Sequence, residues 1–461
     1  MSSKSYHADH LWLDGRWADR ARVDVDTHGR IARLASEAPL AEADSLGKWV
    51  LPGMPNLHSH AFQRAMAGLA ERRGNKDDNF WSWREVMYTF AERVGPDELQ
   101  AIAAQVYVEM LKAGYTRVCE FHYLHQQPGG AAYDDPASMS LALIEAAREA
   151  GIGLTLLPVL YMSGGFDGRA LGERQRRFGL DVDAYLSLLE RLQDLHDDTL
   201  QVGVALHSLR AVPAAAMQAV LESSLTRDCP IHIHIAEQVG EVQDCLAVRN
   251  TTPVAWLLDH ASVDQRWCLV HATHMTDDER TRLAASGAVA GLCPTTEANL
   301  GDGLFPLSEY VKAGGALGIG SDSNISVSPV QELRWLEYGQ RLKSGQRNVA
   351  AGIRDDDTTS TSVGETLWQL ALRGGMQASA AVAPHADGLP GADFIVLDDA
   401  AAQLAARGKR SMLDSFIFAG DTPLVRDVMV AGRWQVQGFH HRDEQRIAER
   451  YRSVIEALQK A

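Results

Sequence analysis

Eight short apolar runs alternate with amphipathic helical runs along most of this chain, and this alternation constrains the fold more strongly than any other feature. Apolar strand-like runs separated by helices are typical of parallel sheets that are covered by helices. Eight is the number of strands that closes such a sheet into a barrel. We therefore expect an α/β fold, a (β/α)8 barrel of the TIM type. The expected strands centre on Leu51–His58, Arg117–Phe121, Leu154–Val159, Val202–Leu206, Ile231–Ile235, Trp267–His271, Ala288–Cys293 and Ala316–Gly320.

The two ends of the chain differ from this pattern, because their short strand-like runs are separated by turn residues. The dipeptide Asp14-Gly15 stands between two such runs, which predicts a tight β-hairpin. Near the C-terminus we expect strands over 393–398 and 425–437 and a closing helix over 443–459. Both ends are therefore expected to build one small β-sandwich domain. The expected division is residues 1–51 with 386–461 for this domain and residues 52–385 for the barrel domain.

Helix and loop signals are also present between the expected strands. Pro96 opens an amphipathic helix, and Thr276 with Glu279 forms a capping box at the start of another. Two long segments, 64–95 and 163–179, are expected to be loops that follow the first and third strands. Loops that follow strands lie at the C-terminal face of such a barrel, where active sites are found.

Composition and charge exclude several classes of protein. Of the 461 residues, 46% are hydrophobic and 23% are charged, which is typical of a globular protein. The formal net charge of −16 argues against nucleic acid as a partner, because a phosphate backbone requires a basic surface. No apolar run is long enough to span a membrane, and the N-terminus lacks the pattern of a signal peptide, so the expected compartment is the cytoplasm. The five cysteines form no CxxC pair and are expected to be buried free thiols.

Side chains of the types that bind metals gather at the ends of the expected strands. His58 and His60 end the first strand, and residues two apart on a strand point to the same side. His234 ends the fifth strand, His271 ends the sixth, and Asp322 follows the eighth. A single His-x-His pair is as compatible with core packing as with metal binding. Four such strand ends at one face of a barrel favour a site for a divalent metal.

The fifth strand carries two histidines, and both face the barrel interior. His234 lies nearer the mouth, so we expect it to be a ligand and His232 to be a core histidine. No lysine follows the third or fourth strand where a carbamate could bridge two ions, so one ion per chain is favoured. Nitrogen and oxygen ligands suit iron(II) or manganese nearly as well as zinc. The expected ligands are His58, His60, His234 and Asp322.

These motifs resemble one known group of enzymes. The pattern His58-x-His60, His234-x-x-Glu237, His271 and Asp322 resembles the mononuclear deaminases of the amidohydrolase superfamily, over nearly the whole chain. Longer motifs are similar to those of the formimidoylglutamate deiminases: HSHAFQR at 58–64, HSLR at 207–210, HIHIAEQ at 232–238 and SDSN at 321–324. The resemblance implies hydrolysis of N-formimino-L-glutamate, an intermediate of histidine degradation, to N-formyl-L-glutamate and ammonia. It also implies zinc as the metal.

The same residues indicate how such an enzyme would use water. A divalent ion acidifies a water that it binds. Asp322 can bind the ion and also accept a proton from that water. Glu237 can move protons to the departing nitrogen, and His271 can hydrogen-bond the attacking oxygen. The alternative interpretations are a surface carboxylate for Glu237 and a core histidine for His271.

The implied substrate is a small dianion, which an acidic protein must bind through local positive charge. Arg84 and Arg210 are candidates for bidentate carboxylate binding. The family resemblance adds Gln63, Tyr123 and His207 as residues that orient the substrate. Arg84 as a solvated loop residue and Tyr123 as a core residue are the alternatives.

Two other functions are weighed against this one. A purine, pyrimidine or triazine deaminase of the same superfamily would need a pocket with aromatic walls and few arginines. Here two arginines, Arg84 and Arg210, are expected in the substrate site. A non-catalytic scaffold would be expected to have lost metal ligands, and here all of them are present. The exposed edges of the β domain and the resemblance to dimeric barrels predict a homodimer.

Overall fold

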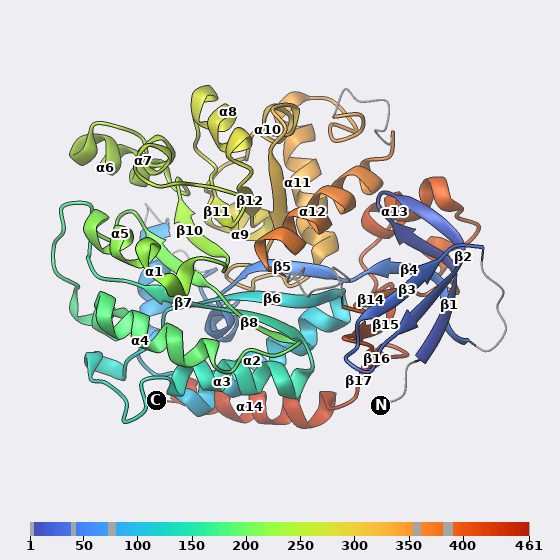
Figure 1. Cartoon of the computed structure of the whole chain (residues 1–461), viewed down its shortest axis with the longest axis horizontal. Helices are drawn as coiled ribbons and strands as arrows, with labels where there is room; N and C mark the ends of the chain where they lie inside the picture. The colour runs from blue at the N-terminus through green and yellow to red at the C-terminus, as the bar shows by residue number, and fades with distance from the viewer. Residues whose placement is uncertain (1–3, 38–42, 72–79, 354–360, 381–390, 461) are drawn as a thin grey trace.

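The computed structural model describes residues 4–37, 43–71, 80–353, 361–380 and 391–460, and everything below refers to these residues. The chain forms a barrel flanked by a second sheet, and both chain ends contribute to that sheet (Figure 1). The boundary expected at residue 386 lies outside the described residues.

Eight parallel strands follow one another around the barrel, and each pairs with the next along the chain. An isolated parallel bridge between Ser59 and Asp322 joins the first strand to the segment after the last, so the barrel is nearly closed. The expected (β/α)8 fold is confirmed. The strands are β5 (Met54–Ser59), β6 (Tyr115–His122), β7 (Gly153–Leu160), β9 (Val204–Ser208), β10 (Ile231–Ile235), β11 (Trp267–His271), β12 (Val289–Leu292) and β13 (Ala316–Ile319), while β8 (Leu200–Val202) pairs with β7 alone.

Two of the expected strands are each divided between two strands in the structure. The run expected from Leu51 is two strands, because Leu51 and Pro52 end β4 (Asp44–Pro52) in the other sheet and β5 begins at Met54. Gly53 separates them where a Cβ atom would lie 2.1 Å from the Thr116 side chain. The fourth expected strand is divided between β8 and β9 around Gly203.

Helices cover the outside of the barrel, and several begin where the sequence signals predicted. Pro96 opens α2, and Thr276 caps α8 through the Glu279 N–H while the Glu279 carboxylate accepts the Thr276 N–H. The helices are α1 (Phe80–Ala91), α2 (Pro96–Ala113), α3 (Ser138–Ala150), α4 (Val182–Gln193), α5 (Ala214–Glu222), α6 (Val239–Arg249), α7 (Pro253–His260), α8 (Asp277–Ser286), α9 (Pro294–Leu300), α10 (Leu307–Lys312), α11 (Pro329–Ser344), α12 (Val363–Ala378), α13 (Lys409–Phe418) and α14 (Glu444–Lys460).

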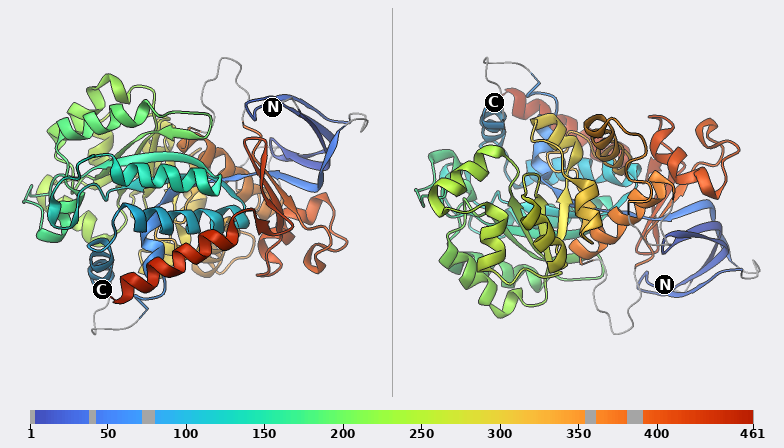
Figure 2. Two further views of the ribbon diagram at one scale, coloured as in Figure 1. Left: turned by 90° about the horizontal axis from the view of Figure 1, so that it is seen from below. Right: turned by 90° about the horizontal axis from the view of Figure 1, so that it is seen from above.

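The second sheet has eight strands, four from each end of the chain. The hairpin expected at Asp14-Gly15 is confirmed, with Leu13 opposite Arg16. The two ends meet where β4 pairs antiparallel with β14. The expected closing helix is α14, which packs along α2 on the outside of the barrel (Figure 2). The strand order is β17 (His440–His441), β16 (Arg433–Gln437), β15 (Val425–Val430), β14 (Phe394–Leu397), β4, β1 (Lys4–Leu13), β2 (Arg16–Val25) and β3 (Ile31–Ala35).

The two segments expected to be long loops are partly helical. Segment 64–95 contains the end of the 3-10 helix η1 (Ala61–Met66) and the whole of α1, and its residues 72–79 lie outside the described part. Segment 163–179 contains the 3-10 helix η3 (Glu173–Phe178). Among the described helices, none combines the length and apolar character that a membrane crossing requires.

Candidate metal centre and substrate cleft

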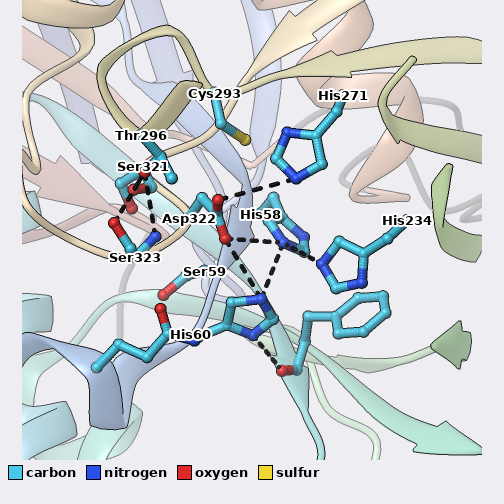
Figure 3. A network of polar contacts seen from close by, with 12 residues as sticks. His58, Ser59, His60, His234, His271, Cys293, Thr296, Ser321, Asp322 and Ser323 are labelled. Carbon is cyan, nitrogen blue, oxygen red and sulfur yellow. Dashed lines mark hydrogen bonds and ion pairs between the residues drawn. The ribbon is translucent and has the colours of Figure 1, made fainter. Parts of the chain in front are cut away.

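Four predicted ligands meet at the C-terminal mouth of the barrel (Figure 3). The Nε2 atom of His58 lies 3.2 Å from Nε2 of His60 and 3.0 Å from Nε2 of His234. Oδ1 of Asp322 lies 3.3 Å from the Nε2 atoms of both His58 and His60. Strands β5 and β10 and the segment after β13 therefore place three imidazole nitrogens and one carboxylate around a single point.

The protonation of these rings fits a bound cation. The Nδ1 atom of His60 lies 2.9 Å from the carbonyl of Phe121, and that of His234 lies 2.9 Å from the carbonyl of His207. A carbonyl accepts only, so each ring carries its proton on Nδ1 and presents a lone pair at Nε2. Burial lowers the pKa of His58 to about 3, so this ring is neutral as well. Lone pairs this close repel one another unless a cation lies between them, so the donor set suits a divalent metal.

A buried hydrogen-bond network holds the segment that carries Asp322 in place. Asn56 on β5 donates through Nδ2 to Oγ of Ser321 at 2.7 Å and accepts the Ser321 backbone N–H at 3.0 Å. Asn324 donates to the carbonyl of His60. Asp322 itself has a φ of +48°, a left-handed conformation that is uncommon for residues other than glycine. The network stabilises this turn and joins the first strand of the barrel to the last.

A second group of ionisable side chains lies beside the four predicted ligands. His271 Nε2 is 3.8 Å from Oε1 of Glu237 and 3.8 Å from Oδ2 of Asp322, while its Nδ1 is 3.2 Å from Oε1 of Glu297. Burial alone would lower the pKa of His271, but the carboxylates of Glu237, Glu297 and Asp322 outweigh it and raise the pKa to about 10. Burial raises the pKa of Glu237 to about 7, although the charge of His271 opposes this. A proton donor and a group able to exchange protons near neutral pH therefore face the ligand cluster.

The cluster opens into a cleft whose wall contains every predicted substrate residue. Gln63 and Tyr123 are joined by a hydrogen bond of 2.9 Å. Burial raises the pKa of Tyr88 to about 12, and the charges of Arg84 and Arg210 both oppose this, so the two guanidinium groups lie near the same tyrosine. The predicted residues in the wall are Gln63, Arg84, Tyr123, His207, Arg210, Glu237 and His271, with the predicted ligands His60, His234 and Asp322.

The structure also adds cleft residues that the sequence analysis missed. Tyr88 on α1, Tyr161 after β7 and Phe178 at the end of η3 form aromatic wall, and Glu241 on α6 lines the cleft near Glu237. On α1, the residues Arg84, Met87 and Tyr88 all line the cleft, and this helical spacing was the signal that could have placed them.

The structure also shows where His232 and the five cysteines lie. His232 lies outside the ligand cluster, and its Nε2 is 2.8 Å from the carbonyl of Ala378, as expected for a core histidine. All five cysteines are free and buried, as expected. Cys293 lies near the cluster in Figure 3, and burial raises the pKa of its thiol far above the ordinary value.

Comparison with known proteins places the chain in a family. A profile described as the amidohydrolase family matches residues 49–356. Formimidoylglutamate deiminase of Pseudomonas aeruginosa is 49% identical over 458 residues, which are 98% of each chain. The crystal structure of an amidohydrolase from Brucella melitensis is 43% identical with a TM-score of 0.91, covering 99% of this chain and 100% of that one. An 8-oxoguanine deaminase of Pseudomonas aeruginosa is 27% identical over 348 residues, which are 72% of this chain and 74% of that one.

The profile spans the barrel and all four residues of the ligand cluster. The two most similar of these relatives match almost the whole chain, so the similarity includes the sheet built from both ends. This chain belongs to the amidohydrolase family.

Proposed function

We propose that this enzyme hydrolyses N-formimino-L-glutamate to N-formyl-L-glutamate and ammonia. The observation that carries the proposal is the composition of the cleft. Its wall contains Arg84 and Arg210 together with Glu237, His271 and part of the ligand cluster. The identity of 49% to a formimidoylglutamate deiminase along nearly the whole chain supports the same substrate. A neutral purine or triazine ring carries no carboxylate that two guanidinium groups could bind.

The reaction adds the oxygen of water to the formimino carbon and breaks the bond from that carbon to its imine nitrogen. A divalent ion held by His58, His60, His234 and Asp322 would lower the pKa of the water and so supply the nucleophile. Asp322 accepts a proton from that water through its carboxylate. Glu237 delivers a proton to the imine nitrogen as the oxygen adds, which leaves a carbon that bears a hydroxyl and an amino group. The amino nitrogen then takes the proton held by Asp322 while Glu237 takes the hydroxyl proton, so the carbon–nitrogen bond breaks, ammonia leaves and the carbon becomes a formyl group. His271 donates a hydrogen bond to the oxygen that adds to the carbon.

A direct test is ammonia release from N-formimino-L-glutamate, N-guanidino acids, guanine and cytosine, compared at equal concentrations. We expect rapid release from the formimino compound. Activity confined to guanine or cytosine would instead favour a heterocycle deaminase, to which the arginines would contribute little.

Replacement of either arginine by methionine should weaken the reaction strongly. A hydrogen bond to a charged group contributes about 1.5–3 kcal/mol. Loss of one arginine should therefore lower kcat/KM roughly ten- to 150-fold, at about 1.4 kcal/mol per tenfold. Lysine should not restore activity, because a point charge cannot reproduce the planar guanidinium fork. Steady-state kinetics of Arg84→Met, Arg210→Met and the two lysine variants measure this, and normal rates in both methionine variants would contradict the dianion site.

Four further features belong to this proposal: the metal, the assembly, the compartment and the domain division. The metal is one ion per chain, and we propose zinc because the resemblance to the mononuclear deaminases implies it and nitrogen donors suit it. The assembly is a homodimer, and the compartment is the cytoplasm. We also propose the domain division into residues 1–51 with 386–461 and residues 52–385. Its first boundary, between Leu51 and Pro52, lies at the last residue of β4.

A further inference from the structure

Tyr161 stands at the wall of the cleft in a position that no motif of the sequence marks. It directly follows β7, is 2% exposed and lines the cleft together with His207 and Phe178. Its ring meets the ring of His207 edge-on at 4.4 Å and lies 5.8 Å from that of Phe178. These rings fix the direction in which the phenol oxygen points.

Two donors converge on the phenol oxygen of Tyr161. Nη2 of Arg84 lies 3.2 Å from it, and Nε2 of Gln175 lies 2.9 Å from it. A guanidinium group has no acceptor, so Arg84 can only donate. The Gln175 amide is oriented by its other end, because its Oε1 accepts the backbone N–H of Gly172 at 2.9 Å in the cap of η3. Its nitrogen therefore faces Tyr161 and donates as well.

The phenol hydrogen must then point elsewhere. The oxygen accepts from Arg84 and from Gln175, and among the described residues its O–H makes no hydrogen bond. The atom lies beside the guanidinium group of Arg84 in the wall of the cleft. The O–H and the Arg84 N–H groups thus form a set of donors that suits the two oxygens of one carboxylate.

We infer that Tyr161 is a specificity-determining residue that donates its O–H to the same substrate carboxylate that Arg84 binds. The inference rests on the proposed function. A carboxamide at this place would turn its NH2 group toward the Tyr161 O–H and the Arg84 N–H groups. Because an NH2 group only donates, one of these protein donors would lose its acceptor. Tyr161 therefore helps to select a free acid over its amide, beyond the attraction of the positive charge.

The test compares Tyr161→Phe with native enzyme on N-formimino-L-glutamate, N-formimino-L-glutamine and N-formimino-L-isoglutamine. We expect roughly a tenfold or larger rise in KM for the diacid with a smaller change in kcat. The variant should affect one of the two amides very little, and that amide identifies the carboxylate concerned. An unchanged KM for the diacid, or equal effects on all three compounds, would overturn the inference.

A double variant of Tyr161 and Arg84 distinguishes direct contact between Tyr161 and the substrate from a role in which Tyr161 only holds Arg84 in place. If Tyr161 contacts the substrate, Tyr161→Phe should still raise KM in the Arg84→Met background, and no further rise there would overturn the inference. Tyr185→Phe is the matched control, because this buried tyrosine donates to the carbonyl of Pro158 at 3.1 Å away from the cleft wall. It should leave KM unchanged. Native enzyme that releases no ammonia from the diacid would overturn the proposed function itself, whereas normal native activity with an unaffected Tyr161→Phe variant would overturn this inference alone.

Discussion

Glu237→Gln is expected to keep the metal and the fold but to lose roughly 10²–10⁴-fold in kcat, the usual contribution of a general acid–base group. Glutamine has the same shape as glutamate, but its amide cannot take up and release the proton that the departing nitrogen needs. The carboxylate lies 3.8 Å from His271 and faces the ligand cluster without belonging to it. Rapid-quench or steady-state ammonia release, with metal content measured on the same sample, gives the answer.

The control for this variant is Glu190→Gln, which makes the same chemical change at an exposed position on α4. It should have native kcat. Near-native turnover of Glu237→Gln would mean that another group moves the proton, and His271 would then be the first residue to examine.

The double variant His60→Ala, His234→Ala should lose both the bound ion and all measurable turnover. It removes two of the four ligand atoms, and an ion held by one imidazole and one carboxylate in a site built for four donors is bound weakly. Purified native protein should hold about one divalent ion per chain by elemental analysis. We expect the double variant to hold far less and to remain inactive when metal is added.

His232→Gln is the matched control for the histidine variants. His232 lies on the same strand, two residues from His234, but hydrogen-bonds the carbonyl of Ala378 outside the cluster. Glutamine can keep that bond, so this variant should retain the ion. Stoichiometric metal in the double variant would show that other residues form the site.

The sequence predicted the barrel and the ligand cluster because both depend on regular spacing. A strand places alternate side chains on one side, so the spacing of His58 and His60 alone assigns both to one point. Parallel strands end at one face, which brought His234 and Asp322 to the same point.

Other parts of the site follow from contacts that have no regular spacing. Tyr161 after an apolar strand looks like a core residue, and its role depends on Gln175, whose amide is turned by a cap at Gly172. Glu297 lies on α9, and it meets His271 only because two barrel segments converge there. The sequence also joined β4 to β5, because the apolar run at the end of β4 continues past Gly53 into Met54. The Pro52-Gly53 pair was the turn signal that could have separated them.

The pairing of β4 with β14 has a consequence for how the protein is made. Pro52 lies opposite Phe394, so one edge of β4 finds its partner only after the whole barrel has left the ribosome. Until then β1, β2 and β4 form an incomplete sheet with an open edge, and such edges favour association between chains. Contacts this distant in the sequence also form slowly. The nascent chain is therefore most prone to aggregate in the interval between the synthesis of β4 and that of β14. Variants that weaken the second sheet should lower the yield of folded enzyme while the kcat of the folded molecules stays native.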